Sequence, residues 1–215
     1  MKNKSYESFY LGMEAPEVVV ELVNLHPEAE FIKFQEYTPH ALGVTEQLKK
    51  EPEISVKSMI RHHPDAGEYA IQLKRENVTS EKLRDLIARA LTRGKALVLC
   101  SRVETRDDEI LHIPMLDFEC QVSDKNLQKI RDFVTELGDS GLVLESGRSY
   151  HYYSFNLVSH NKWVKFMART LLFTGFIDTR HIGHRILSGE ARLRLAKIDG
   201  SDRYIMTPRV VSVVV

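Results

Sequence analysis

The chain has 215 residues, of which 43% are hydrophobic and 28% are charged, and this balance is typical of a soluble globular protein of one large or two small domains. Lysine and arginine together number 30, as do aspartate and glutamate, so the formal net charge is zero. The balance argues against a protein that coats polyanions through bulk positive charge, and it leaves room for a local basic patch.

Targeting signals and cysteine usage favour a cytoplasmic protein. Residues 1–10 contain no apolar signal core, and the longest apolar run, residues 164–176, is broken by Lys165 and Arg169. We therefore expect no membrane partner. The two cysteines, Cys100 and Cys120, both stand in apolar strand-like runs, which favours buried reduced thiols over a disulfide.

The first elements in chain order are the hardest to predict. Pro16 stands at the first helical position of a segment that continues through residues 18–25. Residues 30–37 and 54–61 are ambiguous between strand and helix, and residues 62–67 have the composition of a turn.

Clear patterns begin after this turn. Alternating side chains predict a strand over residues 69–74. Thr79 then caps a helix that ends at Gly94, and a second strand follows over residues 95–103. The apolar stripe of this helix consists of Leu83, Leu86, Ile87, Ala90 and Leu91.

An acidic strand is the first candidate for chemistry. A polar connection over residues 104–109 makes a hairpin into the apolar stretch 113–120, where Asp117 and Glu119 point to the same face. Neighbouring carboxylates repel each other, and a divalent cation such as Mg²⁺ or Mn²⁺ removes the conflict. The plainer alternative, an edge strand with a wet polar face, is the better interpretation of an isolated Asp-x-Glu.

Helices and strands continue to alternate through the second half. A helix capped by Ser123 or Asp124 ends at Gly138, and two strands follow. These strands occupy residues 141–145 and 149–156. The last elements are two helices and two strands, at residues 161–175, 179–187, 191–198 and 209–215, with Asn161 and Asp178 as the helix caps. The order suggests a mixed sheet covered by helices, in an α+β or α/β layer fold.

The second candidate lies between the two middle strands. Gly147 permits a tight backbone, and the guanidinium of Arg148 suits a forked pair of hydrogen bonds to phosphate. Ser149 and His151 share a strand face, so that a hydroxyl and an imidazole converge on one anion. The alternative is a hairpin turn beside a core histidine.

The third candidate is the predicted helix after Asp178. Arg180, Gly183 and His184 are spaced i, i+3 and i+4, which places two donors beside a position without a side chain. A solvated basic face is the alternative. His181 and His184 have the spacing of a zinc pair, but no further ligands stand at convincing spacing.

Together these motifs resemble the archaeo-eukaryotic primase superfamily. Its catalytic core has a strand with two acids, matched by Asp117 and Glu119, and a later Ser-x-His strand, matched by Ser149 and His151. The resemblance covers about half of the chain, roughly residues 97–198. It implies an α+β fold in which an RRM-like mixed sheet with helices is joined to an N-terminal α/β unit, with units at residues 1–95 and 96–215.

The resemblance also implies a mechanism. Asp117 and Glu119 would ligate Mg²⁺ or Mn²⁺. These two acids and His151 would be the catalytic residues. Arg148, Ser149 and His151 would bind the triphosphate of an incoming nucleotide, and a 3′-hydroxyl would attack its α-phosphorus. The implied partners are a nucleoside triphosphate, single-stranded or primed nucleic acid, and a replication protein.

Two further features extend or depart from this pattern. Arg180 and His184 would add phosphate or template contacts. This assignment rests on the predicted helix and not on a match to a family motif. The third motif of the family ends a late strand with an acid, whereas this chain has Arg192 and Arg194 there, with Asp199 just beyond.

We therefore expect a primase-polymerase-like nucleotidyltransferase. Because the third acid is missing, a degenerate relative that binds nucleotide or nucleic acid as a sensor or adaptor is the first alternative. A metal-dependent nuclease or phosphohydrolase that uses the same acids is the second.

Overall fold

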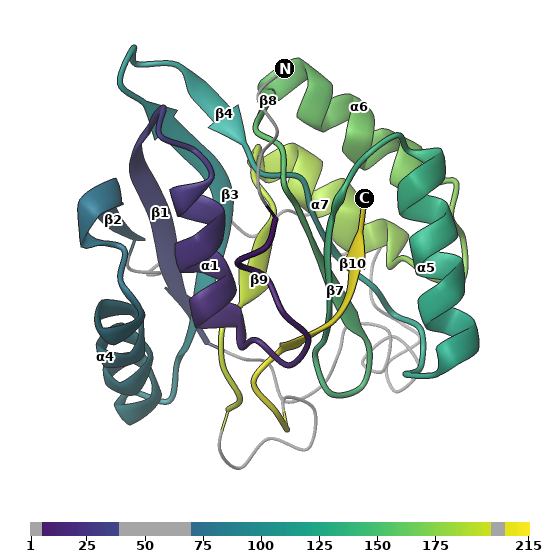
Figure 1. The fold of residues 1–215 in the computed structure, drawn as a ribbon, viewed down its shortest axis with the longest axis horizontal. Helices are drawn as coiled ribbons and strands as arrows, with labels where there is room; N and C mark the ends of the chain where they lie inside the picture. The colour runs from purple at the N-terminus through teal and green to yellow at the C-terminus, as the bar shows by residue number, and fades with distance from the viewer. Residues whose placement is uncertain (1–5, 39–69, 199–204) are drawn as a thin grey trace, which may run out of the picture.

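The structure is a computed structural model that describes residues 6–38, 70–198 and 205–215. The ambiguous segment 54–61, the predicted turn 62–67 and Asp199 lie outside the described residues. Two antiparallel sheets stand side by side through the molecule, with helices against their outer faces (Figure 1). The expected α+β class is confirmed, and all pairings between the named strands of the described part are antiparallel.

The first sheet has the order β2-β1-β3-β4-β8, with β9 paired to β3. Its strands are β1 (Ala29–Tyr37), β2 (Ala70–Lys74), β3 (Ala96–Thr105), β4 (Ile110–His112), β8 (Val158–Ser159) and β9 (Arg192–Arg194). The ambiguous segment 30–37 is thus a strand. Residues 70–74 confirm the next predicted strand, and the short helix η1 (Arg75–Asn77) follows it.

Two helices cover one face of this sheet. Helix α1 (Ala15–Asn24) begins with Pro16 in its first turn, as predicted, and α4 (Ser80–Thr92) begins after Thr79, whose side chain accepts from the Lys82 N–H. Their buried side chains pack with the alternate, core-facing residues of β1 and β3. The opposite face of the sheet is the polar one, because Lys33, Gln35 and Arg102 project from it.

The second sheet has the order β10-β6-β7-β5. Its strands are β5 (Met115–Asp117), β6 (Gly141–Glu145), β7 (Tyr150–Ser154) and β10 (Arg209–Val214). The helices on this side are α5 (Asp124–Glu136), α6 (His160–Thr170) and α7 (Thr179–Ser188). In chain order, the elements from β5 onward are β5, α5, β6, β7, β8, α6, α7, β9 and β10. Strand β9 lies beside β5 while it pairs with β3, so the two sheets meet there.

The acidic stretch is a much shorter strand than the sequence predicts. Residues 113–120 are expected to be extended throughout, but only Met115–Asp117 form β5. The chain changes sheets at this point: the Ile113 N–H donates to the Ser101 carbonyl of the first sheet, and the Pro114 carbonyl accepts from the Ser154 N–H of the second. Proline has no N–H with which to continue the first ladder.

Helix α6 also differs from the prediction. The expected cap is Asn161, but the helix begins at His160 directly after Ser159, because Ser159 still pairs with Leu111 in the first sheet. The helix ends at Thr170, and the chain tightens into i to i−3 hydrogen bonds at Leu172 and Phe173. The last inner strand is shorter too, since β9 has three residues where residues 191–198 are expected.

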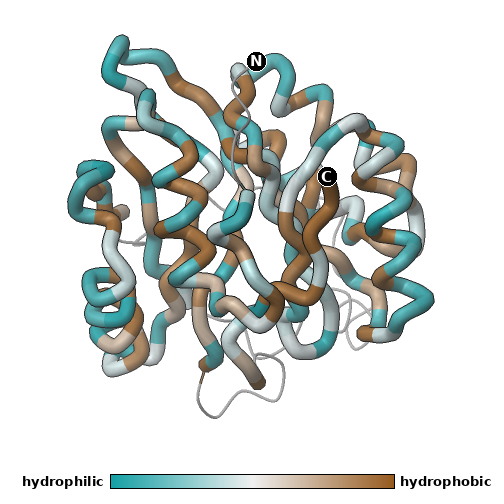
Figure 2. Tube along the Cα trace, in the orientation of Figure 1, coloured by the Kyte–Doolittle hydropathy of each residue, from teal (hydrophilic) through white to brown (hydrophobic). Residues whose placement is uncertain are grey.

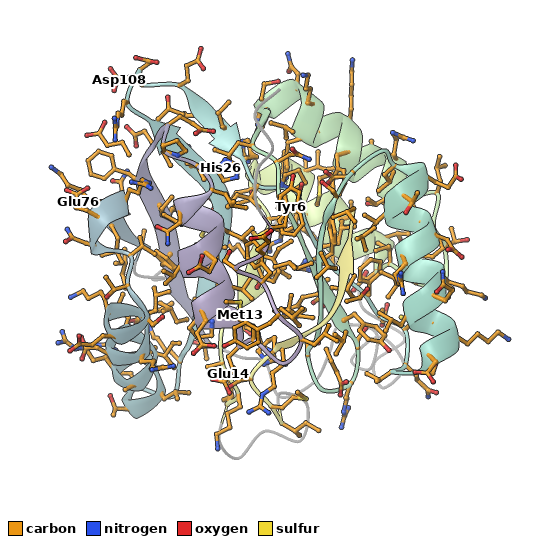
Figure 3. All side chains as sticks on the ribbon, viewed as in Figure 1. Tyr6, Met13, Glu14, His26, Glu76 and Asp108 are labelled. Atoms are coloured by element: carbon orange, nitrogen blue, oxygen red, sulfur yellow. The ribbon has the colours of Figure 1, made fainter. Side chains whose placement is uncertain are left out.

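The N-terminal segment connects the two halves. The Gly12 N–H donates to the Val210 carbonyl at 2.8 Å, and the Val210 N–H returns a bond to Met13 at 2.9 Å, which ties the segment to β10. The Tyr6 ring stacks on Phe155 at 4.2 Å. Tyr6 and Met13 both fall near the middle of the molecule (Figure 3). The division into units 1–95 and 96–215 stays a prediction.

The hydropathy of the chain follows this layering. The inner strands are largely hydrophobic, whereas α4 and α5 carry many hydrophilic residues (Figure 2). In the described part of the chain, every helix is too short or too polar to cross a membrane.

Candidate active site

Asp117 and His151 lie directly opposite each other on β5 and β7, in the last Cα pair of that ladder. His151 Nε2 is 3.6 Å from Asp117 Oδ1. The Asp117 side chain is 46% exposed and that of His151 only 4%. The fold therefore brings the first two motifs together, with the carboxylate at the surface and the imidazole beneath it.

The environment of His151 keeps its ring neutral. Burial lowers the pKa of His151 well below its usual value, and the charges of Arg194 and His181 lower it further. The contact with Asp117 is therefore not an ion pair, and 3.6 Å is too long for a good hydrogen bond. His151 Nδ1 is buried and makes no hydrogen bond with the residues that the structure describes. A buried nitrogen without a partner costs about 1–3 kcal/mol of stability.

Glu119 lies just beyond the end of β5 and is exposed. Phe118 between the two acids is buried, which agrees with the expected alternation and directs both carboxylates outward. The backbone here is fixed from two sides: the Phe118 N–H donates to the Tyr150 carbonyl at 2.9 Å, and the Glu119 N–H donates to the Phe176 carbonyl at 2.8 Å.

The turn between β6 and β7 carries the second candidate. Gly147 has a φ of 110°, a conformation that disfavours any side chain. Arg148 is exposed and forms no hydrogen bond or ion pair with the described residues. The Ser149 hydroxyl donates to the Phe118 carbonyl at 2.5 Å, so its single proton already holds the turn against the acidic strand.

Helix α7 is anchored next to the acids. Phe118 forms a bridge with Ile177, and Asp178 then caps the helix by accepting from the His181 N–H at 3.0 Å. The spacing on the predicted helix selects Arg180 and His184. His184 is half-buried, and the side chain of Arg180 is not among those described.

The structure adds two residues that the motif search did not select. His181 lies close enough to His151 to influence its pKa. Arg194 is buried at 5% exposure, and its guanidinium donates to the carbonyls of Ser146, Ala196 and Met206. In the sequence, Arg194 could have been noticed as a basic residue at the position where the family has its third acid. In the structure, its charge lies close enough to His151 to lower the pKa of that ring.

The carboxylates are of the type that binds divalent metal. Mg²⁺ usually takes one or two carboxylates and completes its shell with water and substrate phosphates. Asp117 and Glu119 meet this requirement as two outward-facing oxygen donors. Within the described residues no group of three or more histidine, cysteine, aspartate or glutamate side chains is arranged to hold a metal ion, which weighs against a closed zinc site.

An α+β fold with an acidic strand beside a Ser-x-His strand defines the catalytic core of a primase-type protein. Residues 74–207 match the family model described as AEP-like, archaeo-eukaryotic primase 1D-like. The match covers more than half of the chain, and the chain belongs to the archaeo-eukaryotic primase superfamily.

Two other comparisons complete this result. Among solved structures, the chain is similar to the AEP domain (PP-N190) of the primase-polymerase (PrimPol) of cyanophage S-2L, with 16% sequence identity. The likeness covers 91% of this chain and 88% of that chain, at a TM-score of 0.48. A search of curated proteins finds no match.

Proposed function

We propose that the chain is a primase-polymerase-type nucleotidyltransferase that transfers nucleotides from NTP or dNTP to a 3′-hydroxyl on a nucleic-acid template. Membership of the superfamily supports the general class. The observation that carries the proposal is the proximity of Asp117 and His151, 3.6 Å apart, although 33 residues of chain separate the two motifs.

In this proposal Asp117 and Glu119 bind Mg²⁺ or Mn²⁺. The bound ion supplies charge neutralisation for the phosphates and lowers the pKa of the attacking hydroxyl. Asp117 orients one carboxylate from a rigid strand, and the backbone bonds of Phe118 and Glu119 fix the second.

The triphosphate would bind at the turn between β6 and β7. Arg148 offers a forked guanidinium from an exposed position, and neutral His151 offers one N–H. The proton of Ser149 reaches a phosphate only if the hydroxyl releases the Phe118 carbonyl. Arg180 and His184 on α7 are proposed as further phosphate or template contacts.

The test is nucleotide incorporation on primed and bare templates with Mg²⁺ or Mn²⁺. We expect incorporation that is abolished by a chelator and restored by added metal ion. The same assay should be repeated with every NTP and dNTP. Absence of incorporation under all conditions, together with absence of nucleotide-dependent metal binding, would contradict the proposal.

A second function is favoured by the basic residue at the third-motif position. If Arg194 replaces an acid that catalysis needs, the chain binds nucleotide or nucleic acid without turnover, as a sensor or adaptor. Binding that survives Asp117→Ala supports this second function. Binding that requires Asp117 and a divalent ion supports the enzyme instead.

A further inference from the structure

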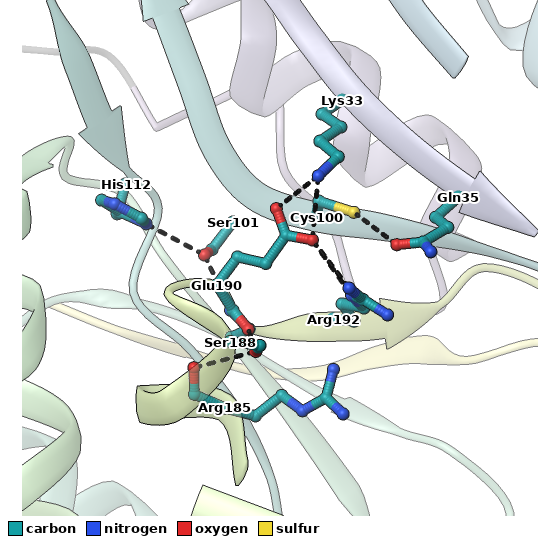
Figure 4. A network of polar contacts seen from close by, with 10 residues as sticks. Lys33, Gln35, Cys100, Ser101, His112, Arg185, Ser188, Glu190 and Arg192 are labelled. Carbon is teal, nitrogen blue, oxygen red and sulfur yellow. Dashed lines mark hydrogen bonds and ion pairs between the residues drawn. The ribbon is translucent and has the colours of Figure 1, made fainter. Parts of the chain in front are cut away.

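The two arginines of β9 have different partners, although they lie two residues apart on the strand. Arg192 donates to the carboxylate of Glu190 through Nε at 3.1 Å and Nη2 at 3.0 Å (Figure 4). Arg194 is 5% exposed, and its guanidinium points at backbone carbonyls. Its Nη1 and Nη2 atoms donate to the carbonyls of Ala196 at 2.9 Å, Met206 at 2.7 Å and Ser146. Hydrogen bonds from a charged donor are stronger than neutral ones, so Arg194 ties β9 firmly to other segments of the chain.

One of these carbonyls belongs to the turn between β6 and β7. Ser146 begins this turn and is buried. Its N–H and its hydroxyl both donate to the Ser149 carbonyl, at 2.8 and 3.1 Å. The Ser149 hydroxyl donates to the Phe118 carbonyl at 2.5 Å. A series of hydrogen bonds therefore runs from Arg194 through the turn to the acidic strand.

A second carbonyl, that of Met206, belongs to a segment that packs on the same turn. A Cβ atom at Gly147 would lie 3.1 Å from Ile205 Cγ1 and 3.3 Å from Met206 Cγ, so this segment lies directly against the glycine. Arg194 binds both the turn and the segment that packs on it. The exposed Arg148 therefore projects from a backbone that is held on two sides.

We propose that Arg194 is a positioning residue, which holds the β6–β7 turn so that Arg148 is presented to the triphosphate of a nucleotide. This inference rests on the proposed function, because it takes the turn as the triphosphate site. A guanidinium suits the task because its planar fork directs donors at fixed angles and so fixes two carbonyls relative to each other. A looser turn would have to be ordered when the nucleotide binds, and that ordering lowers affinity.

Binding of dTTP is measured by calorimetry with Mg²⁺ but without primer or template, so that no transfer takes place. The test variant is Arg194→Met, which keeps an unbranched side chain and removes its donors. The matched control is Arg169→Met. Arg169 also donates to two backbone carbonyls, those of Glu136 and Leu137, but it is exposed, and these carbonyls precede β6, whereas the turn follows it.

We expect Arg194→Met to weaken dTTP binding about tenfold. Its affinity for Mn²⁺ alone, measured by electron paramagnetic resonance, should stay the same, because the backbone of Phe118 and Glu119 is fixed by bonds to Tyr150 and Phe176. A general loss of structure would lower both affinities. Arg169→Met should change neither.

A double-variant cycle with Arg148→Gln tests whether Arg194 acts through the turn. If Arg194 positions Arg148, then Arg194→Met should weaken dTTP binding much less in the Arg148→Gln background than in the wild type. Equal losses in the two backgrounds would overturn the positioning role.

Gly147→Ala disturbs the same turn without a change at Arg194, and it decides the question if Arg194→Met does not fold. The added Cβ must displace Ile205 and Met206, and the φ of 110° disfavours alanine. We expect weaker dTTP binding with the same Mn²⁺ affinity, and unchanged dTTP binding would overturn the inference.

Failure of the inference differs from failure of the proposed function. If the wild type binds dTTP but incorporates no nucleotide, the proposed chemistry is wrong, and the loss of dTTP affinity in Arg194→Met still supports the positioning role. If Arg194→Met folds and binds dTTP as the wild type does, the positioning role is wrong whatever the activity. A wild type that does not bind dTTP contradicts both.

Discussion

The Asp117 site on the second sheet and the cluster of Lys33, Glu190 and Arg192, which line a polar pocket on the first sheet, arrange their charges in opposite ways. In the pocket, a buried carboxylate is bound by two cations. In the Asp117 site, the carboxylate is 46% exposed and the His151 ring opposite it is kept neutral. The first arrangement pairs a buried carboxylate within the chain, whereas the second presents a carboxylate at the surface.

The largest expected effect is the loss of activity in Asp117→Asn. An amide cannot supply the charge that a divalent ion requires, so we expect incorporation to fall about a thousandfold, equivalent to about 4 kcal/mol of transition-state stabilisation. Primer-extension rates measure it. Asp107→Asn, an exposed change in the β3–β4 hairpin, is the control and should retain full activity. Similar rates for both variants would remove Asp117 from the chemistry.

The cluster of Lys33, Glu190 and Arg192 should affect stability through its buried ion pairs. Glu190→Ala leaves Lys33 and Arg192 close together without their shared carboxylate, and we expect a loss of about 3 kcal/mol in the free energy of unfolding. Urea denaturation measures it. Asp85→Ala breaks an exposed pair with Arg89 and should cost less than about 0.5 kcal/mol. Equal costs would show that burial does not distinguish the two pairs.

Both regions contain a buried neutral histidine, which predicts how stability depends on pH. The pKa of His112 is lowered to about 4 and that of His151 falls well below its usual value, in each case mainly by burial. In the unfolded chain both rings bind protons below about pH 6.5, where the folded protein does not. Stability is therefore complete above that pH and is lost as the pH falls toward 4.

Thermal unfolding between pH 7.5 and 4.5 measures this dependence. We expect Tm to fall through the interval, and His112→Gln should flatten the fall because the variant has one protonating ring fewer. A Tm that is constant between pH 6.5 and 4.5 would contradict the buried neutral state of these histidines.

Local features of the fold were predictable and long-range ones were not. Helix starts follow from single capping residues, and Thr79, Ser123 and Asp178 all accept the expected backbone N–H. The pairing of β9 with β3 depends on sheet topology, which no local pattern encodes. Glu190 belongs to no motif, and its partner Lys33 is 157 residues away. The sequence therefore indicated the acids and the Ser-x-His strand but gave no indication of the pocket.

The smallest expected effect concerns Ser149, whose hydroxyl links the second motif to the first. Ser149→Ala removes the bond to the Phe118 carbonyl and should cost about 1 kcal/mol of stability. Ser123→Ala, which removes the cap of α5, should cost a similar amount at a distance from the site. If the hydroxyl turns to the triphosphate during the reaction, only Ser149→Ala raises the KM for nucleotide severalfold. A KM that stays the same in both variants would assign Ser149 to holding the turn, and would leave Arg148 and His151 as the triphosphate ligands.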